Sequence, residues 1–242
     1  MRDPTTLGAA ADRKPWVPVA RYAAAMPLLL LDLDNTLVDR AAAYRAWAAS
    51  YLEKRGASPD LLGPMIAADG DGLRYKPDVA ADLADILGLT QAETEGIVRV
   101  LRAGVLEHLV LVPGCVEALR RARAAGWTPF VLTNGVVAQQ ESKIRSLGLD
   151  AEVDGWVISD AVGVRKPDPA IYRLAAEASG LPLESAWIIG DAADTDILGA
   201  HRAGIHSVYL HRGRAWDDAF PRPTAEASSL TEAVRIVVES GE

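Results

Sequence analysis

The sequence LLLLDLDNTL, from Leu28 to Leu37, joins an apolar run to a pair of acids. Four successive leucines favour a buried parallel strand, and this strand ends abruptly at Asp32 and Asp34. Because side chains alternate along an extended backbone, the two carboxylates point to the same side. Ligands bind at the carboxyl ends of strands in open α/β sheets, so the paired acids indicate a functional site. This stretch alone also allows a simple Asx-type turn at Asp34 and Asn35.

Three later segments show related patterns. FVLTNG (130–135) is a second apolar strand that ends in a hydroxyl and a flexible Asn-Gly pair. VRKPDP (164–169) places a lysine, Lys166, just before a helix that a proline begins. WIIGDAADTD (187–196) is another apolar strand that runs into an acidic loop.

Taken together and in this order, the four segments resemble the four motifs of the haloacid dehalogenase-like hydrolase superfamily. The resemblance covers roughly residues 27 to 212. It implies an α/β fold with a doubly wound, Rossmann-like parallel sheet and an inserted helical cap domain.

The resemblance also implies roles for four side chains. Asp32 would be the nucleophile that becomes an aspartyl-phosphate, and Asp34 would protonate the departing oxygen and then activate the hydrolytic water. Thr133 would hydrogen-bond a phosphoryl oxygen. The ammonium of Lys166 would offset charge on the nucleophile and the phosphate.

A divalent cation is expected in the same site. The resemblance assigns Mg²⁺ to the Asp32 carboxylate, the backbone carbonyl of Asp34 and the Asp191 carboxylate. Asp196 would ligate the ion or hydrogen-bond the waters bound to it. Oxygen ligands of this kind suit a hard divalent ion.

Asp34 separates branches of the superfamily. Members that cleave carbon–halogen bonds or phosphonates resemble this pattern but lack an acid two residues after the nucleophile. The resemblance therefore implies a Mg²⁺-dependent phosphomonoester hydrolase of a small phosphorylated metabolite. Phosphosugar mutases keep both aspartates, so a mutase is an open alternative, as is a catalytically idle binding or regulatory member.

Alternating strands and helices follow Pro113-Gly114, which is typical of a parallel sheet with right-handed crossovers. Between the first and second motifs the apolar residues recur at helical spacing instead. We therefore expect an α/β core over 27–40 and 112–242 and a helical cap over 41–111. Residues 1–26 show no clear period and are expected to be a poorly ordered extension, with Met26 as an alternative start of translation.

Residues of the cap are expected to select the substrate. Tyr44 and Arg45 lie in the first expected cap helix, and Arg74 and Lys76 follow a turn-rich Asp-Gly segment. We also expect Asn134, next to Thr133, to contact the substrate. For the cap residues, an ordinary position on a helix surface is the alternative.

Composition limits the partners. The chain of 242 residues carries 25 basic and 33 acidic residues, a formal net charge of −8, which argues against sequence-independent nucleic-acid binding. The apolar runs are too short to span a membrane. A single cysteine, Cys115, cannot form an intramolecular disulfide and fits a reducing, cytoplasmic environment. Nothing in the sequence chooses between a monomer and a homodimer.

Overall fold

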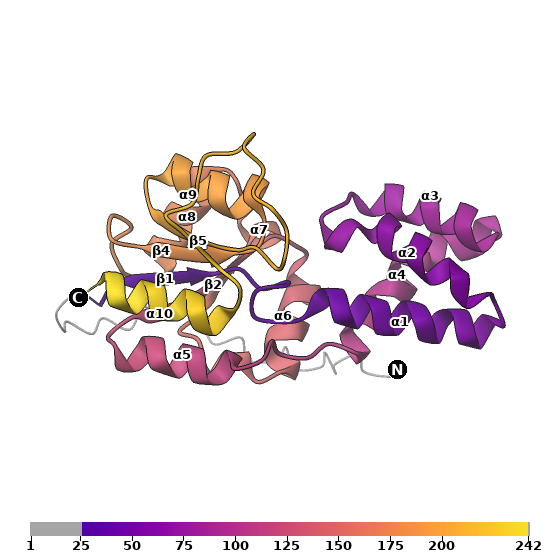
Figure 1. Cartoon of the computed structure of the whole chain (residues 1–242), viewed down its shortest axis with the longest axis horizontal. Helices are drawn as coiled ribbons and strands as arrows, with labels where there is room; N and C mark the ends of the chain where they lie inside the picture. Colours follow the sequence, from indigo (N-terminus) through magenta and orange to yellow (C-terminus); the bar gives the residue numbers. More distant parts are fainter. Residues whose placement is uncertain (1–25, 242) are drawn as a thin grey trace, which may run out of the picture.

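The computed structural model describes residues 26–241. The predicted poorly ordered extension therefore lies, except for Met26, outside the described residues. Figure 1 shows two arrangements along the chain: a sheet with helices on both sides, and a group of four helices, α1–α4, beyond one end of the sheet. Within the described range, no helix combines the length and apolar composition needed to cross a bilayer.

A six-stranded sheet organises the described residues, with strand order β3-β2-β1-β4-β5-β6. All neighbouring strands are parallel, so the predicted fold class is confirmed. The strand order reverses beside β1, which is where doubly wound folds bind their ligands. The strands are β1 (Leu28–Leu31), β2 (Thr128–Thr133), β3 (Trp156–Ile158), β4 (Trp187–Gly190), β5 (His206–Leu210) and β6 (Ala225–Ala227).

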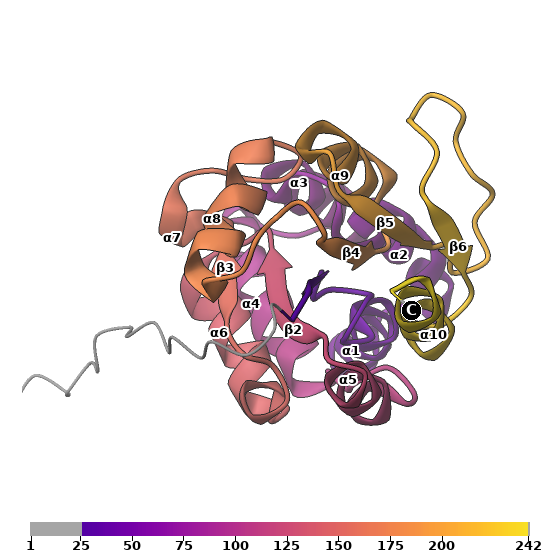
Figure 2. The same ribbon diagram turned by 90° about the vertical axis from the view of Figure 1, so that its left-hand side faces the viewer.

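The leucines of β1 serve both faces of the sheet. Leu29 and Leu31 belong to the apolar core shared with α5, α6 and α10, whereas Leu28 and Leu30 pack with α8 and α9. All four are fully buried, which explains why a central strand reads as a continuous apolar run. Figure 2 shows these helices around the sheet. Their bounds are α5 (Cys115–Ala124), α6 (Val137–Ser146), α7 (Ser159–Val162), α8 (Pro169–Ser179), α9 (Leu198–Ala203) and α10 (Leu230–Ser240).

The segment from Arg40 to Glu107, called the helical block below, contains α1–α4. The sequence Thr90-Gln91-Ala92-Glu93 predicts a capping box, and the structure has one at the start of α4, where Thr90 is the N-cap. Helices α1 and α4 approach closely because Gly104 leaves room for Trp47: a Cβ on Gly104 would lie 1.9 Å from the indole Cδ1. The elements of the block are α1 (Arg40–Arg55), η1 (Pro59–Leu61), α2 (Leu62–Asp69), η2 (Gly70–Gly72), α3 (Lys76–Leu87) and α4 (Gln91–Glu107).

Several boundaries differ from the sequence prediction. The sequence pattern predicts one short helix over 60–68, but the structure has a 3₁₀ turn, η1, followed by α2. It also predicts a helix over 195–203, which is divided into the π-helical η4 (Ala193–Ile197) and α9. Pro221 and Pro223 predict a loop over residues 211–225, and the sequence pattern does not predict strand β6, which begins at Ala225. It has only three residues and pairs with a single neighbour, β5, so it lacks the long apolar signature of an inner strand.

Candidate active site

Three neighbouring strands, β2, β1 and β4, end at one edge of the sheet with Thr133, Asp32 and Asp191. These residues line a cavity of about 730 Å³. The helical block supplies another part of its wall, through the segment from Asp71 to Lys76 and through α4. The structure therefore brings together the residues of all four motifs: Asp32, Asp34, Thr133, Asn134, Lys166, Asp191 and Asp196.

Lys166 is the centre of a buried ionic cluster. Its Nζ lies 2.6 Å from Asp32 Oδ1, 2.7 Å from Asp196 Oδ1 and 2.7 Å from the carbonyl oxygen of Leu132. The ammonium is fully shielded, with 1% of the residue exposed, so its charge is balanced by the two carboxylates. A lysine before a proline is usually a surface residue, whereas Lys166 is buried.

The amide of Asn134 fixes the position of Lys166. Its Nδ2 donates to the Lys166 carbonyl at 3.0 Å, and its Oδ1 accepts from the Lys166 amide at 2.9 Å. Both ends of the side chain are therefore engaged with one backbone residue. That Asn134 contacts the substrate stays a prediction, since the residue lines the cavity and the second N–H of its Nδ2 is not engaged.

Burial raises the pKa of Asp32 to about 8, and the neighbouring Asp196 and Asp191 act in the same direction against Lys166. Burial also raises the pKa of Asp191 to about 6, with Asp196 adding to the shift and Arg214 opposing it. Carboxylates crowded in this way favour either a proton or a cation between them.

Asp32, Asp191 and Asp196 each offer an oxygen within 4.8 Å of the others, so the donor set suits a hard divalent ion. Lys166 donates to Oδ1 of Asp32, so Oδ2 of Asp32 is available. Oδ2 of Asp191 accepts from Arg212 and Arg214, so Oδ1 of Asp191 is available. Asp196 differs, because Lys166 binds its Oδ1 and the amide of Ala192 binds its Oδ2. This pattern fits two direct carboxylate ligands, with Asp196 in an orienting role.

Asp34 is bound by two side chains of α6. The Nζ of Lys143 lies 2.7 Å from both carboxylate oxygens, and Gln140 Nε2 donates to Oδ2 at 3.2 Å. Burial opposes ionisation of Asp34, but Lys143, Arg40 and Gln140 outweigh it and lower its pKa. The structure therefore favours the ionised carboxylate that a general base needs.

The hydroxyl of Thr133 faces the same pocket. It accepts a hydrogen bond from Gln140 Nε2 at 2.7 Å, while its own donation to the Asn134 carbonyl is long, at 3.4 Å. The hydroxyl proton is thus weakly engaged and can turn to an incoming acceptor.

The predicted substrate residues of the helical block divide into two pairs. Tyr44 is buried and donates to the Met65 carbonyl at 2.9 Å, and the exposed Arg45 does not line the cavity; neither is kept as a substrate contact. Arg74 lines the cavity but pairs with Asp82 at 2.5 Å. Lys76 also lines it, and burial, together with the charge of Arg40, lowers its pKa to about 8.

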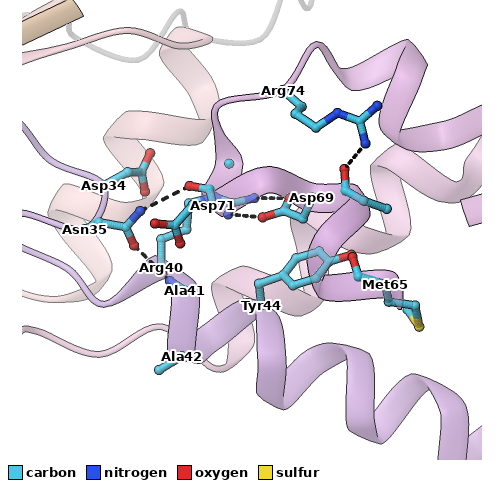
Figure 3. A network of polar contacts seen from close by, with 12 residues as sticks. Asp34, Asn35, Arg40, Ala41, Ala42, Tyr44, Met65, Asp69, Asp71 and Arg74 are labelled. Carbon is cyan, nitrogen blue, oxygen red and sulfur yellow. Dashed lines mark hydrogen bonds and ion pairs between the residues drawn. The ribbon is translucent and has the colours of Figure 1, made fainter. Parts of the chain in front are cut away.

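Polar contacts connect the sheet edge to the helical block (Figure 3). Asn35 Nδ2 donates to the carbonyl of Asp71 at 3.2 Å, and Arg212 Nη1 lies 2.5 Å from the Asp71 carboxylate. Within the block, Arg40 and Asp69 form a buried bidentate pair at 2.6 and 2.8 Å. Arg212 also reaches Asp191 at 3.2 Å, so one guanidinium touches both the block and the predicted metal site.

Sequence reasoning missed four residues of this site. Gln140 and Lys143 had a usable signal: they lie three residues apart beside Ile144, so they fall on the stripe of α6 that faces the core. Arg212 and Arg214 follow the last long strand in a segment that reads as an ordinary loop, and no sequence pattern singles them out.

Comparison with known proteins gives a consistent result. The family model of the haloacid dehalogenase-like hydrolases matches residues 26–204. A phosphoserine phosphatase of Thermus thermophilus is 35% identical over 122 residues, which cover 50% of this chain and 49% of that relative. The chain thus spans about half the length of this relative.

Other relatives align over more of their length. A phosphoglycolate phosphatase of Cereibacter sphaeroides is 30% identical over 191 residues, covering 78% of this chain and 86% of the relative. The crystal structure of the HAD-hydrolase YfnB from Bacillus subtilis, bound to magnesium, superposes with a TM-score of 0.75 at 21% identity, covering 88% of this chain and 99% of that one. The last likeness concerns the fold alone.

Proposed function

Since this chain belongs to the haloacid dehalogenase-like hydrolases, we propose that it is a Mg²⁺-dependent phosphatase of small phosphate monoesters. The observation that carries the proposal is the environment of Asp32. One carboxylate oxygen is held by Lys166, whereas the other is available at the end of the central strand, beside the Thr133 hydroxyl and two further acids.

The proposed reaction has two steps. An oxygen of Asp32 forms a bond to phosphorus while the ester P–O bond breaks, and the departing alcohol takes a proton from Asp34. Water then attacks the aspartyl-phosphate, Asp34 accepts its proton, and inorganic phosphate leaves with the Asp32 carboxylate restored. A bound Mg²⁺ would neutralise charge on the phosphoryl oxygens.

The remaining site residues would support these steps. Thr133 donates to a phosphoryl oxygen, and Lys166 balances the charge on Asp32. Asp32, the Asp34 carbonyl and Asp191 would hold the cation. Asp196 would orient Lys166 and the waters of the ion, since both of its oxygens already accept hydrogen bonds.

The proposal extends to the domain organisation. Residues 27–40 and 112–242 would form the catalytic core, and residues 41–111 the cap that covers the cavity and selects the substrate. The contacts of Asp71 with Asn35 and Arg212 support this, because they tie the helical block to the catalytic edge of the sheet.

The names of the relatives, phosphoserine and phosphoglycolate phosphatase, support a small phosphorylated metabolite as substrate. Lys76, at the start of α3, lines the cavity from the helical block and is proposed as a substrate contact. A cytoplasmic location and the absence of nucleic-acid and membrane partners belong to the same proposal. The single cysteine supports the location, and the net charge of −8 argues against nucleic-acid binding.

The experiment uses the full chain and a chromogenic aryl phosphate, with Mg²⁺ or with EDTA. Wild-type protein should release inorganic phosphate only with the metal. Asp32→Asn is nearly isosteric and should keep the fold but lose more than about nine-tenths of the rate, a barrier change of at least ~1.4 kcal/mol. Asp150→Asn, at an exposed position, serves as the control. Turnover by Asp32→Asn at the wild-type rate, or no metal-dependent turnover by any form, would contradict the proposal.

A further inference from the structure

Arg102 of α4 lines the cavity together with its neighbours Leu101 and Val105. It is half-buried, and its Nε is fully buried without a hydrogen-bond partner. Among residues 26–241, no carboxylate pairs with its guanidinium, and no hydrogen bond from it is found. A charged donor group therefore faces the cavity from the helical block without an acceptor of its own.

The other buried or half-buried cations of the cavity wall are paired with acidic residues, whereas Arg165 is exposed. Lys166 pairs with Asp32, Lys143 with Asp34 and Arg40 with Asp69, at distances from 2.6 to 2.7 Å. Arg74 pairs with Asp82 at 2.5 Å. The protein thus neutralises these buried or half-buried cations internally, and Arg102 is an exception that calls for an explanation.

Burying an unpaired donor is unfavourable, more so when it is charged, and native proteins seldom leave one. Apolar neighbours increase the energetic cost of an unpaired guanidinium. They also strengthen its attraction for an anion that enters the cavity. Leu101 and Val105 provide such neighbours on the same helix. The Nε is enclosed by protein atoms, but the terminal nitrogens of the half-buried side chain are not fully buried, so an anionic group of a ligand in the cavity can bind there.

We propose that Arg102 binds a carboxylate on the alcohol part of the substrate, so that the enzyme prefers phosphate monoesters that carry a carboxylic acid. This inference rests on the proposed phosphatase function. A guanidinium carries one positive charge and presents paired N–H groups, which match one carboxylate in charge and geometry. A second phosphate would bring nearly two negative charges and would need a further cation.

The arrangement of the cavity fits such a substrate. Its phosphate end would lie at the sheet edge, near Asp32 and Thr133, and its carboxylate end against α4. The sheet edge and α4 line the same cavity of about 730 Å³, which accommodates a small molecule between them.

Two stable compounds test the proposal on the full chain with Mg²⁺. 3-Phosphoglycerate and glycerol 3-phosphate share one carbon skeleton and differ only in a carboxylate against an alcohol. Wild-type enzyme should prefer 3-phosphoglycerate in kcat/KM by at least about tenfold, the discrimination expected when a buried charge pair forms with one substrate only. Arg102→Gln should remove this preference mainly through KM, and leave glycerol 3-phosphate within about twofold.

Two matched variants complete the design. Arg99→Gln changes an exposed arginine on the same helix, outside the cavity wall, and should behave as wild type. Arg102→Lys keeps the positive charge but lacks the paired N–H groups of the guanidinium. It should therefore retain part of the preference for 3-phosphoglycerate. Equal kcat/KM ratios for wild type and Arg102→Gln would overturn the proposal, as would wild-type enzyme without any preference for the carboxylate.

An aryl phosphate separates this inference from the function on which it rests. All variants should hydrolyse it alike, because it carries no carboxylate. If wild-type protein fails to hydrolyse it with Mg²⁺, the proposed function fails, and calorimetric binding of 3-phosphoglycerate then tests Arg102 alone. Equal affinity of wild type and Arg102→Gln in that titration would reject the carboxylate site independently of turnover.

Discussion

Lys143 Nζ lies 2.7 Å from both carboxylate oxygens of Asp34, and the lysine is almost completely buried, with 2% of the residue exposed. This pair joins helix α6 to the residue expected to handle protons. The pair favours the ionised form of Asp34. This form can act as the base in hydrolysis of the aspartyl-phosphate, but not as the acid that protonates the departing alcohol. To act as the acid, Asp34 must therefore take up a proton although its ion pair with Lys143 favours the ionised carboxylate.

Lys143→Met should raise the pKa of Asp34, because burial then opposes ionisation with less compensation. A base works only when ionised, so activity should be lost as pH falls through the pKa, and the acidic limb of the kcat profile should move to higher pH. We expect a shift of about one pH unit or more. The measurement is the pH dependence of kcat on an aryl phosphate.

Lys143→Arg keeps a positive charge beside Asp34 and should retain a profile closer to that of wild type. An unchanged acidic limb in Lys143→Met would show that the ion pair does not set the ionisation of Asp34. Circular dichroism of both variants checks that the fold survives the change in a buried residue.

Metal binding should release protons. Burial raises the pKa of Asp32 to about 8 and that of Asp191 to about 6 in the absence of metal, and a cation binds the deprotonated forms. Mg²⁺ affinity should therefore increase as pH rises through this range. Near pH 7, binding should release up to about one proton, chiefly from Asp32, and near pH 9 close to none.

Titration calorimetry in two buffers of different ionisation enthalpy measures this proton count. Asp191→Asn serves as the comparison and should bind Mg²⁺ at least about tenfold more weakly, through the loss of a charged ligand. A proton count of zero at pH 7 in wild type would mean that Asp32 is already ionised beside Lys166.

Gly104→Ala should destabilise the helical block. The added Cβ would lie 1.9 Å from Cδ1 of Trp47, a side chain that is 4% exposed, so α1 and α4 would have to move apart. We expect a loss of about 1–3 kcal/mol in the free energy of unfolding. Gly96→Ala on the same helix is the control, since its Cβ would meet nothing closer than Arg99 Nη2 at 3.9 Å. It should be neutral or stabilising by up to about 1 kcal/mol, measured by urea denaturation.

The sequence was informative where local patterns determine structure. The leucines of β1 predicted a central strand, and Thr90 with Glu93 predicted the start of α4, since an unbroken apolar run and a capping box depend on neighbouring residues alone. The first 3₁₀ turn, the π-helical η4 and the edge strand β6 depend on tertiary packing, and their local patterns are weak.

The candidate site divides in the same way. The motif residues end strands or begin helices, so their convergence at one edge follows from the topology of a parallel sheet. The bond of Asn134 to the backbone of Lys166 joins residues 32 positions apart, and that of Lys143 to Asp34 joins residues 109 apart. Such contacts follow from side-chain packing in three dimensions, which spacing in the sequence does not specify.

Asp34→Asn tests the division of labour between the two carboxylates. A poor leaving group needs a proton, whereas an aryl oxide departs readily without one, so the variant should lose more activity on alkyl than on aryl phosphates. The second step also lacks its base in this variant, so the aspartyl-phosphate on Asp32 should accumulate. Intact-mass measurement after brief exposure to an activated aryl phosphate detects the added phosphoryl group.

The same variant also separates the side chain of Asp34 from its backbone. Only the backbone carbonyl is expected to reach Mg²⁺, and among residues 26–241 the Asp34 carboxylate binds Lys143 and Gln140 instead. Mg²⁺ affinity should therefore change less in Asp34→Asn than in Asp191→Asn. Equal losses on aryl and alkyl phosphates without a trapped intermediate would leave Asp34 as a structural residue whose carboxylate anchors Lys143 of α6.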